Sequence, residues 1–286
     1  MKVAIATDTN SGISFKEAGQ NGIFLVPMPV IINSRIYYEN VDLSHEDFYE
    51  LQGKGAEIST TQPAPGDVMN LWDELLKEYD EVVYIPMSSG LSGSCHSAVL
   101  FAEEYDGRVA VVDNHRISVT QRQSVYLAKK LSEEGRDAAS IKKILEDQAF
   151  ESVIYISVDT MEYLKKGGRV TSSAAAIATV LNIKPVLSIN GDKLDSYGKV
   201  RGNKKARRLM TDTIKKDLRE RFSDYDKDRI TIGVAGTFLS EEAADDWKNE
   251  VRNEFPDYRL DYAPLSLSIA VHIGPGCEGI AIMTDP

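Results

Sequence analysis

The stretch that decides the fold lies in the first third of the chain and reads Val82-Val83-Tyr84-Ile85-Pro86-Met87-Ser88-Ser89-Gly90-Leu91-Ser92-Gly93-Ser94. It opens with a short continuous apolar run, which is typical of a strand buried on both faces of a parallel sheet. A turn rich in glycine and serine follows, and a helical pattern begins after it. A strand that passes through such a turn into a helix is the repeating unit of an α/β domain.

The same strand pattern occurs on either side of this stretch, at Val3–Ala6 and Val109–Val112. Helical patterns separate and follow the strands, at 68–79, 97–105, 118–131 and 140–148, the last with Ser140 as its N-cap. The alternation predicts a mostly parallel α/β sheet domain. A hairpin over about residues 28–42, with Asn33-Ser34 at its turn, forms a small insertion.

From about residue 151 the pattern changes to consecutive strands with few helices. A short helix over 161–166 ends at two glycines, and a further helix is expected over 174–181. A second hairpin is expected to pair 185–189 with 193–197 across 190–192. These features predict a two-layer α+β domain. The expected architecture is therefore a two-domain α/β protein, with an N-terminal domain over 1–155 and a C-terminal domain over 156–286.

The composition narrows the function classes. The chain has 286 residues, a formal net charge of −11, 42% hydrophobic and 27% charged residues, which is typical of globular proteins and excludes wholesale disorder. The acidic balance argues against a general nucleic-acid binder. No apolar run approaches a membrane span or a signal peptide. Two cysteines without a CxxC spacing argue against a disulfide scaffold or a zinc site, so we expect a cytoplasmic protein.

Two motif matches lack the context that their chemistry needs. Gly274–Gly279 matches G-x-G-x-x-G, but only one further strand follows it in the sequence, so no βαβ unit continues from it. We expect these glycines to form a turn that approaches another group closely. Asp8-Thr9-Asn10 resembles the D-x-D of aspartyl-phosphate enzymes, but Asn10 replaces the proton donor. A turn that caps the helix near Ser14 is the expected role.

Ser92 allows two interpretations. Gly90–Ser94 nearly matches the nucleophile elbow G-x-S-x-G, and it lies between a buried strand and a helix, as that motif requires. An esterase or thioesterase using Ser92 would also need an acid and a histidine, for which His115 and His272 are candidates. Alternatively, the hydroxyl and amide groups at this helix start bind an anion and attack nothing.

Other segments also favour an anion site. Thr60-Thr61-Gln62-Pro63 places two hydroxyls before a proline and a helix. Lys165–Arg169 and Lys199–Gly202 are basic segments in an acidic protein, and with His272 they could form a positive site for a phosphate or an acidic partner. Solvated lysines beside a C-capping Gly-Gly explain the same residues equally well.

Taken in order, these segments resemble those of the DegV family of bacterial fatty-acid-binding proteins. The resemblance rests on six segments that run from the first expected strand to the last: Asp8, Thr60–Pro63, Ser88–Ser94, Tyr163–Arg169, Ile183–Pro185 and His272–Gly276. Each is weak alone, but six in the family's order are specific. The resemblance implies a carrier, not an enzyme, that encloses a long-chain fatty acid between its two domains.

The resemblance also implies a role for individual residues. The hydroxyls of Thr61 and Ser92 would hold the carboxylate, with no catalytic residue, no metal and no cofactor beyond the bound acid. In family members that serve a bacterial fatty-acid kinase, the protein presents the acid to the kinase and holds the acyl phosphate, with Arg201 and His272 near the head group. Arg169 matches the family's Gly-Gly-Arg. The expected partners are thus a long-chain fatty acid, a fatty-acid kinase and, transiently, a membrane surface, but no nucleic acid.

The chain departs from the family pattern at several positions. Ala64 replaces a serine, and Cys95 replaces a frequent aromatic residue. Asn114-His115-Arg116 and Gln121-Arg122-Gln123 stand where the family tends to have a small residue and then glycines. If that helix lines the tail tunnel, we expect these bulky polar residues to shorten or redirect it.

Overall fold

The structure, a computed structural model, describes residues 1–177 and 182–286 and consists of two compact units. The first unit comprises Met1–Phe150 and Ser266–Ser268, and the second comprises Glu151–Leu265 and Ile269–Pro286. The short segment 266–268 thus belongs to the first unit, although its neighbours in the sequence on both sides belong to the second.

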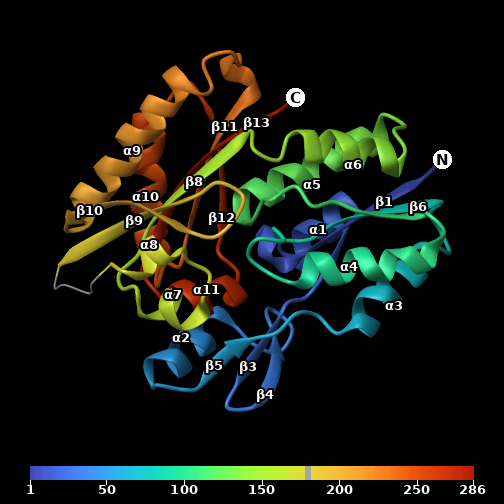
Figure 1. Ribbon diagram of the computed structural model, residues 1–286, viewed down its shortest axis with the longest axis horizontal. Coiled ribbons are helices and arrows are strands. Elements are labelled where there is room, and N and C mark those ends of the chain that lie inside the picture. The colour runs from blue at the N-terminus through green and yellow to red at the C-terminus, as the bar shows by residue number, and fades with distance from the viewer. Residues whose placement is uncertain (178–181) are drawn as a thin grey trace. The chain divides into compact units, whose positions relative to one another are not determined.

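The first unit alternates strands and helices along most of its length (Figure 1). Its elements are β1 (Val3–Asp8), η1 (Thr9–Ser11), α1 (Phe15–Asn21), β2 (Ile23–Val26), β3 (Pro29–Ile32), β4 (Arg35–Tyr38), α2 (His45–Gly53), β5 (Ile58–Thr60), α3 (Pro65–Leu75), β6 (Glu81–Ile85), α4 (Ser94–Ala102), η2 (Glu103–Tyr105), β7 (Val109–Val111), α5 (Ser118–Glu133) and α6 (Ala138–Asp147).

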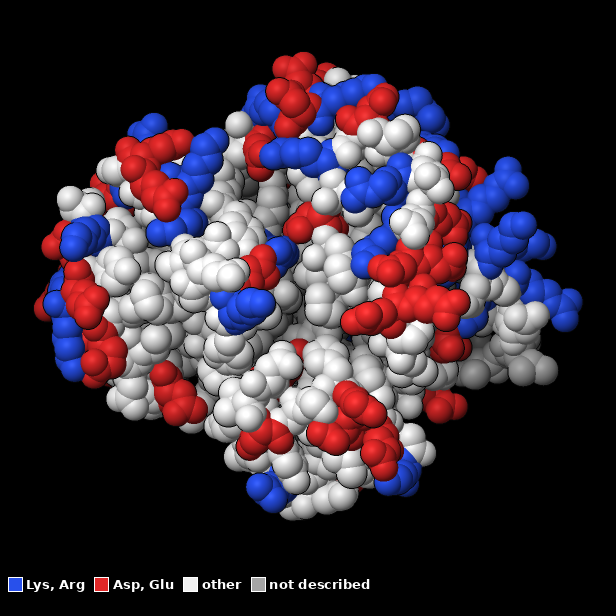
Figure 2. Space-filling model, turned by 180° about the vertical axis from the view of Figure 1, so that it is seen from behind, with Lys and Arg blue, Asp and Glu red and all other residues white. Residues whose placement is uncertain are grey.

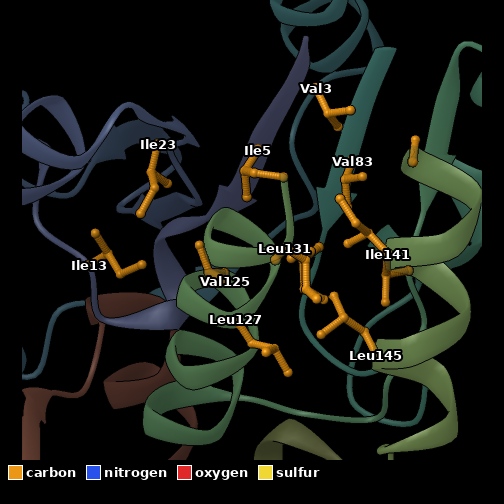
Figure 3. Close-up of a cluster of buried hydrophobic side chains, with 14 of the residues drawn as sticks. Val3, Ile5, Ile13, Ile23, Val83, Val125, Leu127, Leu131, Ile141 and Leu145 are labelled. Atoms are coloured by element: carbon orange, nitrogen blue, oxygen red, sulfur yellow. The ribbon is translucent and has the colours of Figure 1, made fainter. Parts of the chain in front are cut away.

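Its main sheet is parallel throughout, in the order β2-β1-β6-β7. Val3 and Ile5 pack against α1, α5 and α6, whereas Ala4 and Ala6 pack on the opposite face against α3 and α4. Figure 3 shows the first of these two layers, in which side chains of β1 and β6 meet Val125 and Leu131 of α5 and Ile141 and Leu145 of α6. Because helices cover both faces, β1 is buried along its whole length, and its first four residues are apolar.

The strand order places the carboxyl ends of β1 and β6 side by side. In the sheet, β2 lies on one side of β1 and β6 lies on the other. From β1 the chain thus runs first to one edge of the sheet, at β2, and later returns to the other side of β1, at β6. Ligands of open α/β sheets bind outside the carboxyl ends of the strands at such a position. Asp8 ends β1 here, and the turn that contains Ser92 follows β6.

The expected hairpin insertion is confirmed. β3 and β4 pair antiparallel, with Val30 opposite Tyr37, and β5 joins them in a three-stranded sheet of order β4-β3-β5. The turn residues Asn33 and Ser34 have φ of 49° and 67°, the left-handed values that a two-residue hairpin turn requires.

The second unit is built on a six-stranded mixed sheet of order β10-β9-β8-β13-β11-β12. Helices α9 and α10 pack on it around Trp247 and Met210, which are both fully buried. Its elements are β8 (Ser152–Ser157), α7 (Glu162–Gly167), α8 (Ser172–Ala175), β9 (Ile183–Ile189), β10 (Asp195–Arg201), α9 (Asn203–Glu220), η3 (Lys227–Arg229), β11 (Ile230–Gly236), α10 (Glu241–Glu254), β12 (Arg259–Pro264), α11 (Leu267–Ile273, which begins in the first unit) and β13 (Glu278–Thr284).

Several expected boundaries differ from those observed. α6 begins at Ala138 with Asp137 as its N-cap, because the Asp137 carboxylate accepts a hydrogen bond of 2.7 Å from the Ser140 amide. α4 begins at Ser94, earlier than expected. The second hairpin is present, but its outer strand is Asp195–Arg201. Of the helix expected over 174–181, α8 covers the start, and residues 178–181 lie outside the described residues.

Charged side chains of both signs cover the surface. Figure 2 shows basic side chains interspersed with acidic ones over the face in view. Many form ion pairs one helical turn apart, such as Lys143–Asp147 at 2.8 Å. No helix within the described ranges is both long enough and apolar enough to cross a membrane.

Candidate functional site

Ser92 lies in the turn that joins β6 to α4. The amides of Leu91 and Ser92 each donate to the Ser88 carbonyl at 3.1 Å, and these bonds close the turn. Ser92 Oγ accepts a hydrogen bond of 3.2 Å from the amide of Ser94, the first residue of α4. The half-buried Ser92 hydroxyl is therefore placed at a helix N-terminus, where amide groups favour an anion.

Thr61 follows β5 directly and is exposed. Its neighbour Gln62 reaches α4, because Gln62 Oε1 accepts a hydrogen bond of 3.0 Å from Ser97 Oγ. The same Oε1 lies 3.9 Å from the position that a Cβ would take at Gly93. The residues that follow Thr61 and Ser92 are thus side by side. The fold brings the two predicted hydroxyl segments together at the start of α4.

The turn that carries Ser92 is anchored at its base by Asp8, which is fully buried. Asp8 Oδ2 accepts a hydrogen bond from the Met87 amide at 2.9 Å. Asp8 Oδ1 accepts from the Asn10 amide at 3.0 Å and from Gln121 Nε2 at 3.1 Å. Burial raises the pKa of the Asp8 carboxyl, and these hydrogen bonds oppose the rise. Asp8 caps η1 and not the helix near Ser14, since Ser14 itself caps α1.

In the second unit, two motifs more than a hundred residues apart in the sequence come together. A Cβ at Gly167 would lie 2.5 Å from His272 Nδ1, and a Cβ at Gly274 would lie 2.4 Å from the ring of Tyr163. Gly274 also has φ of 76°, which favours glycine. The expectation that glycines after His272 allow a close approach is therefore confirmed. The Gly168 cap that ends α7 is confirmed too, with φ of 69°.

His272 lies at the end of α11 and is half-buried. Burial, together with the positive charge of the nearby Arg169, lowers the pKa of His272 to about 4. Arg169 is held by its own turn, since its guanidinium donates to the Gly167 carbonyl at 2.5 Å. At neutral pH the imidazole is therefore uncharged, and Arg169 carries the positive charge in this cluster.

Arg201 stands apart from this cluster. It is the exposed last residue of β10, immediately before α9. Within the described part of the chain its side chain forms no hydrogen bond or ion pair with Arg169 or His272. Arg169 and His272 are thus close enough for the charge of the guanidinium to act on the imidazole, whereas Arg201 presents an exposed guanidinium. The predicted positive site stays a prediction.

Sequence reasoning missed several residues that hold these segments in place. Thr237 Oγ1 donates to the Gly274 carbonyl at 2.8 Å and accepts from the Cys277 amide at 2.9 Å. Asn10 Oδ1 accepts hydrogen bonds from the hydroxyls of Ser266 and Ser268, which lie at the start of α11. No local pattern marks these residues, because their partners are tens to hundreds of positions away.

The hydrogen-bond partner of Ser92 Oγ can be compared with what the esterase alternative requires. A serine triad needs a histidine hydrogen-bonded to the nucleophile. Among the residues that the structure describes, no histidine forms such a bond with Ser92 Oγ, whose partner is the Ser94 amide.

Across 1–177 and 182–286, no group of three His, Cys, Asp or Glu side chains could hold a metal ion.

Several of the bulky polar residues near the start of α5 have hydrogen-bond partners within the first unit. Asn114 Nδ2 donates to Ser124 Oγ at 2.8 Å. Arg116 is only 2% exposed and donates to Gln123 Oε1 and to the Gln148 carbonyl, each at 2.6 Å. Such partners are required for a buried guanidinium. The expected effect of these residues on an acyl tail stays a prediction.

Known proteins match this chain over almost its full length. The family model described as "Uncharacterised protein, DegV family" matches residues 2–285. A DegV domain-containing protein of Deinococcus radiodurans is 31% identical over 286 residues, which cover 99% of this chain and 98% of the relative. The chain belongs to the DegV family.

Solved DegV structures are similar throughout. The structure described as fatty acid binding of a DegV family protein from Thermus thermophilus matches with a TM-score of 0.89 and 30% identity. DegV of Bacillus subtilis, described as a fatty acid binding protein, matches with a TM-score of 0.86 and 27% identity. Both matches cover 100% of each chain. The expected DegV membership and the α/β fold class are thereby confirmed.

Proposed function

We propose that this DegV protein binds a long-chain fatty acid and holds its carboxylate with the hydroxyls of Thr61 and Ser92. The observation that carries the proposal is the full-length similarity to the Thermus thermophilus DegV protein, described as binding fatty acid, at 30% identity and a TM-score of 0.89. The local geometry of the first unit supports it, because the segments of Thr61 and Ser92 meet at the start of α4.

The head group and the tail of a fatty acid contribute differently to the binding free energy. A buried methylene contributes about 0.8 kcal/mol, so a long acyl chain supplies most of the binding free energy. A charge-assisted hydrogen bond contributes roughly 1.5–3 kcal/mol, so the two hydroxyls mainly orient the carboxylate. Such a site needs no nucleophile, which agrees with a Ser92 Oγ whose partner is a backbone amide.

We propose further that the protein acts in the cytoplasm as the accessory subunit of a separate fatty-acid kinase. Arg201 is exposed and solvated, so it can reach a partner or a phosphate without breaking contacts within its own unit. Arg169 supplies positive charge beside His272, and the neutral imidazole can donate or accept a hydrogen bond. We assign Arg169, Arg201 and His272 to the phosphorylated head group or to the surface that meets the kinase.

Lipid extraction from the purified protein, followed by mass spectrometry, tests the fatty-acid proposal. We expect about one intact long-chain acid per protein, and a much lower yield from the Ser92→Ala variant prepared in parallel. A protein that carries no acid and takes up none when acids are added would refute the proposal. Cleavage of an ester that depends on Ser92 would then support the esterase alternative.

A further inference from the structure

The buried carboxylate of Asp8 holds the turn that carries Ser92. Asp8 ends β1, and its Oδ2 accepts the amide hydrogen of Met87 at 2.9 Å. Met87 is the second residue after β6, so this bond fixes the chain as it leaves the sheet. From there the turn continues through Ser88, whose carbonyl accepts the amides of Leu91 and Ser92 at 3.1 Å. The path from Asp8 to Ser92 is thus a short series of defined hydrogen bonds.

A second bond, one residue further on, supports the same turn. The Ser88 amide donates to the carbonyl of Arg116 at 2.8 Å. The turn is therefore anchored by two consecutive amides, one bound to Asp8 and one bound to the segment before α5. Loss of the Asp8 bond should loosen the turn without unfolding it, because the second anchor remains.

The chemistry at Asp8 requires two acceptor oxygens. Oδ1 accepts from the Asn10 amide and from Gln121 Nε2, while Oδ2 accepts from the Met87 amide. The Gln121 side chain is itself fixed, since its Nε2 also donates to Thr7 Oγ1 at 3.0 Å. A carboxamide has one acceptor oxygen and one amino group. An asparagine here would keep the two bonds at Oδ1 and turn its amino group toward the Met87 amide, so the bond that holds the turn would be the one lost.

We propose that Asp8 is a positioning residue for Ser92: its carboxylate fixes the turn after β6 and thereby aims the Ser92 hydroxyl at the fatty-acid carboxylate. The inference rests on the proposed function and adds to it a residue that does not touch the ligand. We expect the loss of the Oδ2 bond to act on the head group, because that bond holds Met87 and the turn that leads from it to Ser92.

The test compares a fatty acid with the fatty alcohol of the same chain length, in the wild-type protein and in Asp8→Asn. We expect the variant to bind the acid about tenfold more weakly and the alcohol within about twofold of wild type, because only the acid uses an aimed hydroxyl as a charge-assisted donor. Glu81→Gln is the matched control. It also removes a partly buried carboxylate of the first unit, but one at the opposite end of β6 from the turn, where it accepts the Ala138 amide at 2.8 Å. This substitution should leave both affinities unchanged.

Amide hydrogen exchange of the ligand-free protein gives a second measurement. The Met87 amide should exchange at least about tenfold faster in Asp8→Asn than in wild type or Glu81→Gln. If Asp8→Asn fails to fold, Gln121→Met removes one donor to Asp8 and should give smaller changes in the same direction.

Equal losses for acid and alcohol, or unchanged acid affinity in a folded Asp8→Asn protein, would overturn the inference. A wild-type protein that binds neither ligand would instead refute the proposed function. In that case unchanged Met87 exchange would show separately that Asp8 does not hold the turn.

Discussion

The imidazole of His272 fills the space that a side chain at position 167 would need, since a Cβ there would lie 2.5 Å from His272 Nδ1. Glycine at 167 is thus required by a residue more than a hundred positions away. This contact joins the Gly-Gly-Arg segment at the end of α7 to the end of α11.

Gly167→Ala should therefore destabilise the protein by about 1–3 kcal/mol, the usual cost of overpacking against a ring that cannot move freely. Gly19→Ala is the control: it lies inside α1, and no described atom lies within 4 Å of its Cβ position. That substitution should stabilise the helix by about 0.5–1 kcal/mol. Urea unfolding of both variants measures the difference, and equal effects would contradict the packing described here.

The neutral state of His272 predicts a pH dependence of stability. Its pKa is about 4 in the folded protein, against an ordinary value of 6.5. Between these values the unfolded chain binds a proton that the folded chain does not, so the free energy of unfolding should fall as the pH drops from about 6.5 to 4. The contribution of this group is at most about 3 kcal/mol. The difference in unfolding free energy between wild type and His272→Gln isolates it, and a difference that is constant from pH 7 to pH 4 would argue against a buried neutral imidazole.

Local sequence patterns predicted β1, β6 and β7 of the parallel sheet, because helices on both faces favour apolar runs in those strands. They did not predict β2 (Ile23–Val26), the fourth strand of that sheet. They also predicted the hairpin at Asn33-Ser34, whose turn needs left-handed residues. The predicted N-cap of α6, Ser140, was wrong. Aspartate and serine are both favourable N-cap residues, and the hydrogen bond from the Ser140 amide to the Asp137 carboxylate makes Asp137 the N-cap.

Tertiary contacts between distant residues could not be predicted in this way. The segment 266–268 belongs to the first unit because Ser266 and Ser268 donate to Asn10, and because Glu39 accepts the Leu267 amide at 3.0 Å. Thr237, which organises the turn at Gly274, has no motif around it. For the site, the sequence marked the segments of Thr61 and Ser92 as candidates for binding an anion, and the resemblance assigned both hydroxyls to one carboxylate. The proximity of Gln62 to Gly93 emerges only from the fold.

Acyl-chain length should set the affinity. If the tail is buried, each methylene removed weakens binding by about fourfold, following about 0.8 kcal/mol per CH₂. Affinity should reach a plateau at the length that the site accommodates. Competition between saturated acids of increasing length measures this series, and an affinity that does not depend on length would rule out a buried tail.

Arg201→Ala should leave fatty-acid binding nearly unchanged and sharply lower the rate of acyl-phosphate formation by a cognate kinase. Arg208→Ala is the matched control, since Arg208 is also an exposed arginine of the second unit and pairs only loosely with Asp212 at 3.6 Å. Measured phosphorylation of a fixed amount of loaded protein separates the two. If Arg201→Ala instead lost fatty-acid binding while its remaining complex was phosphorylated normally, Arg201 would belong to the site that binds the acid and not to the surface that meets the kinase.

The affinity of Ser92→Ala for a long-chain fatty acid tests the central claim most directly. Loss of one charge-assisted hydrogen bond, roughly 1.5–3 kcal/mol, predicts binding about ten- to a hundredfold weaker than wild type. Thr61→Val should show a similar loss, Ser92→Thr a smaller one, and the Thr61 and Ser92 losses should not add, because both hydroxyls bind one anion. A Ser92→Ala protein that binds the acid as tightly as wild type, while the wild-type Ser92 is labelled by a fluorophosphonate, would contradict the account.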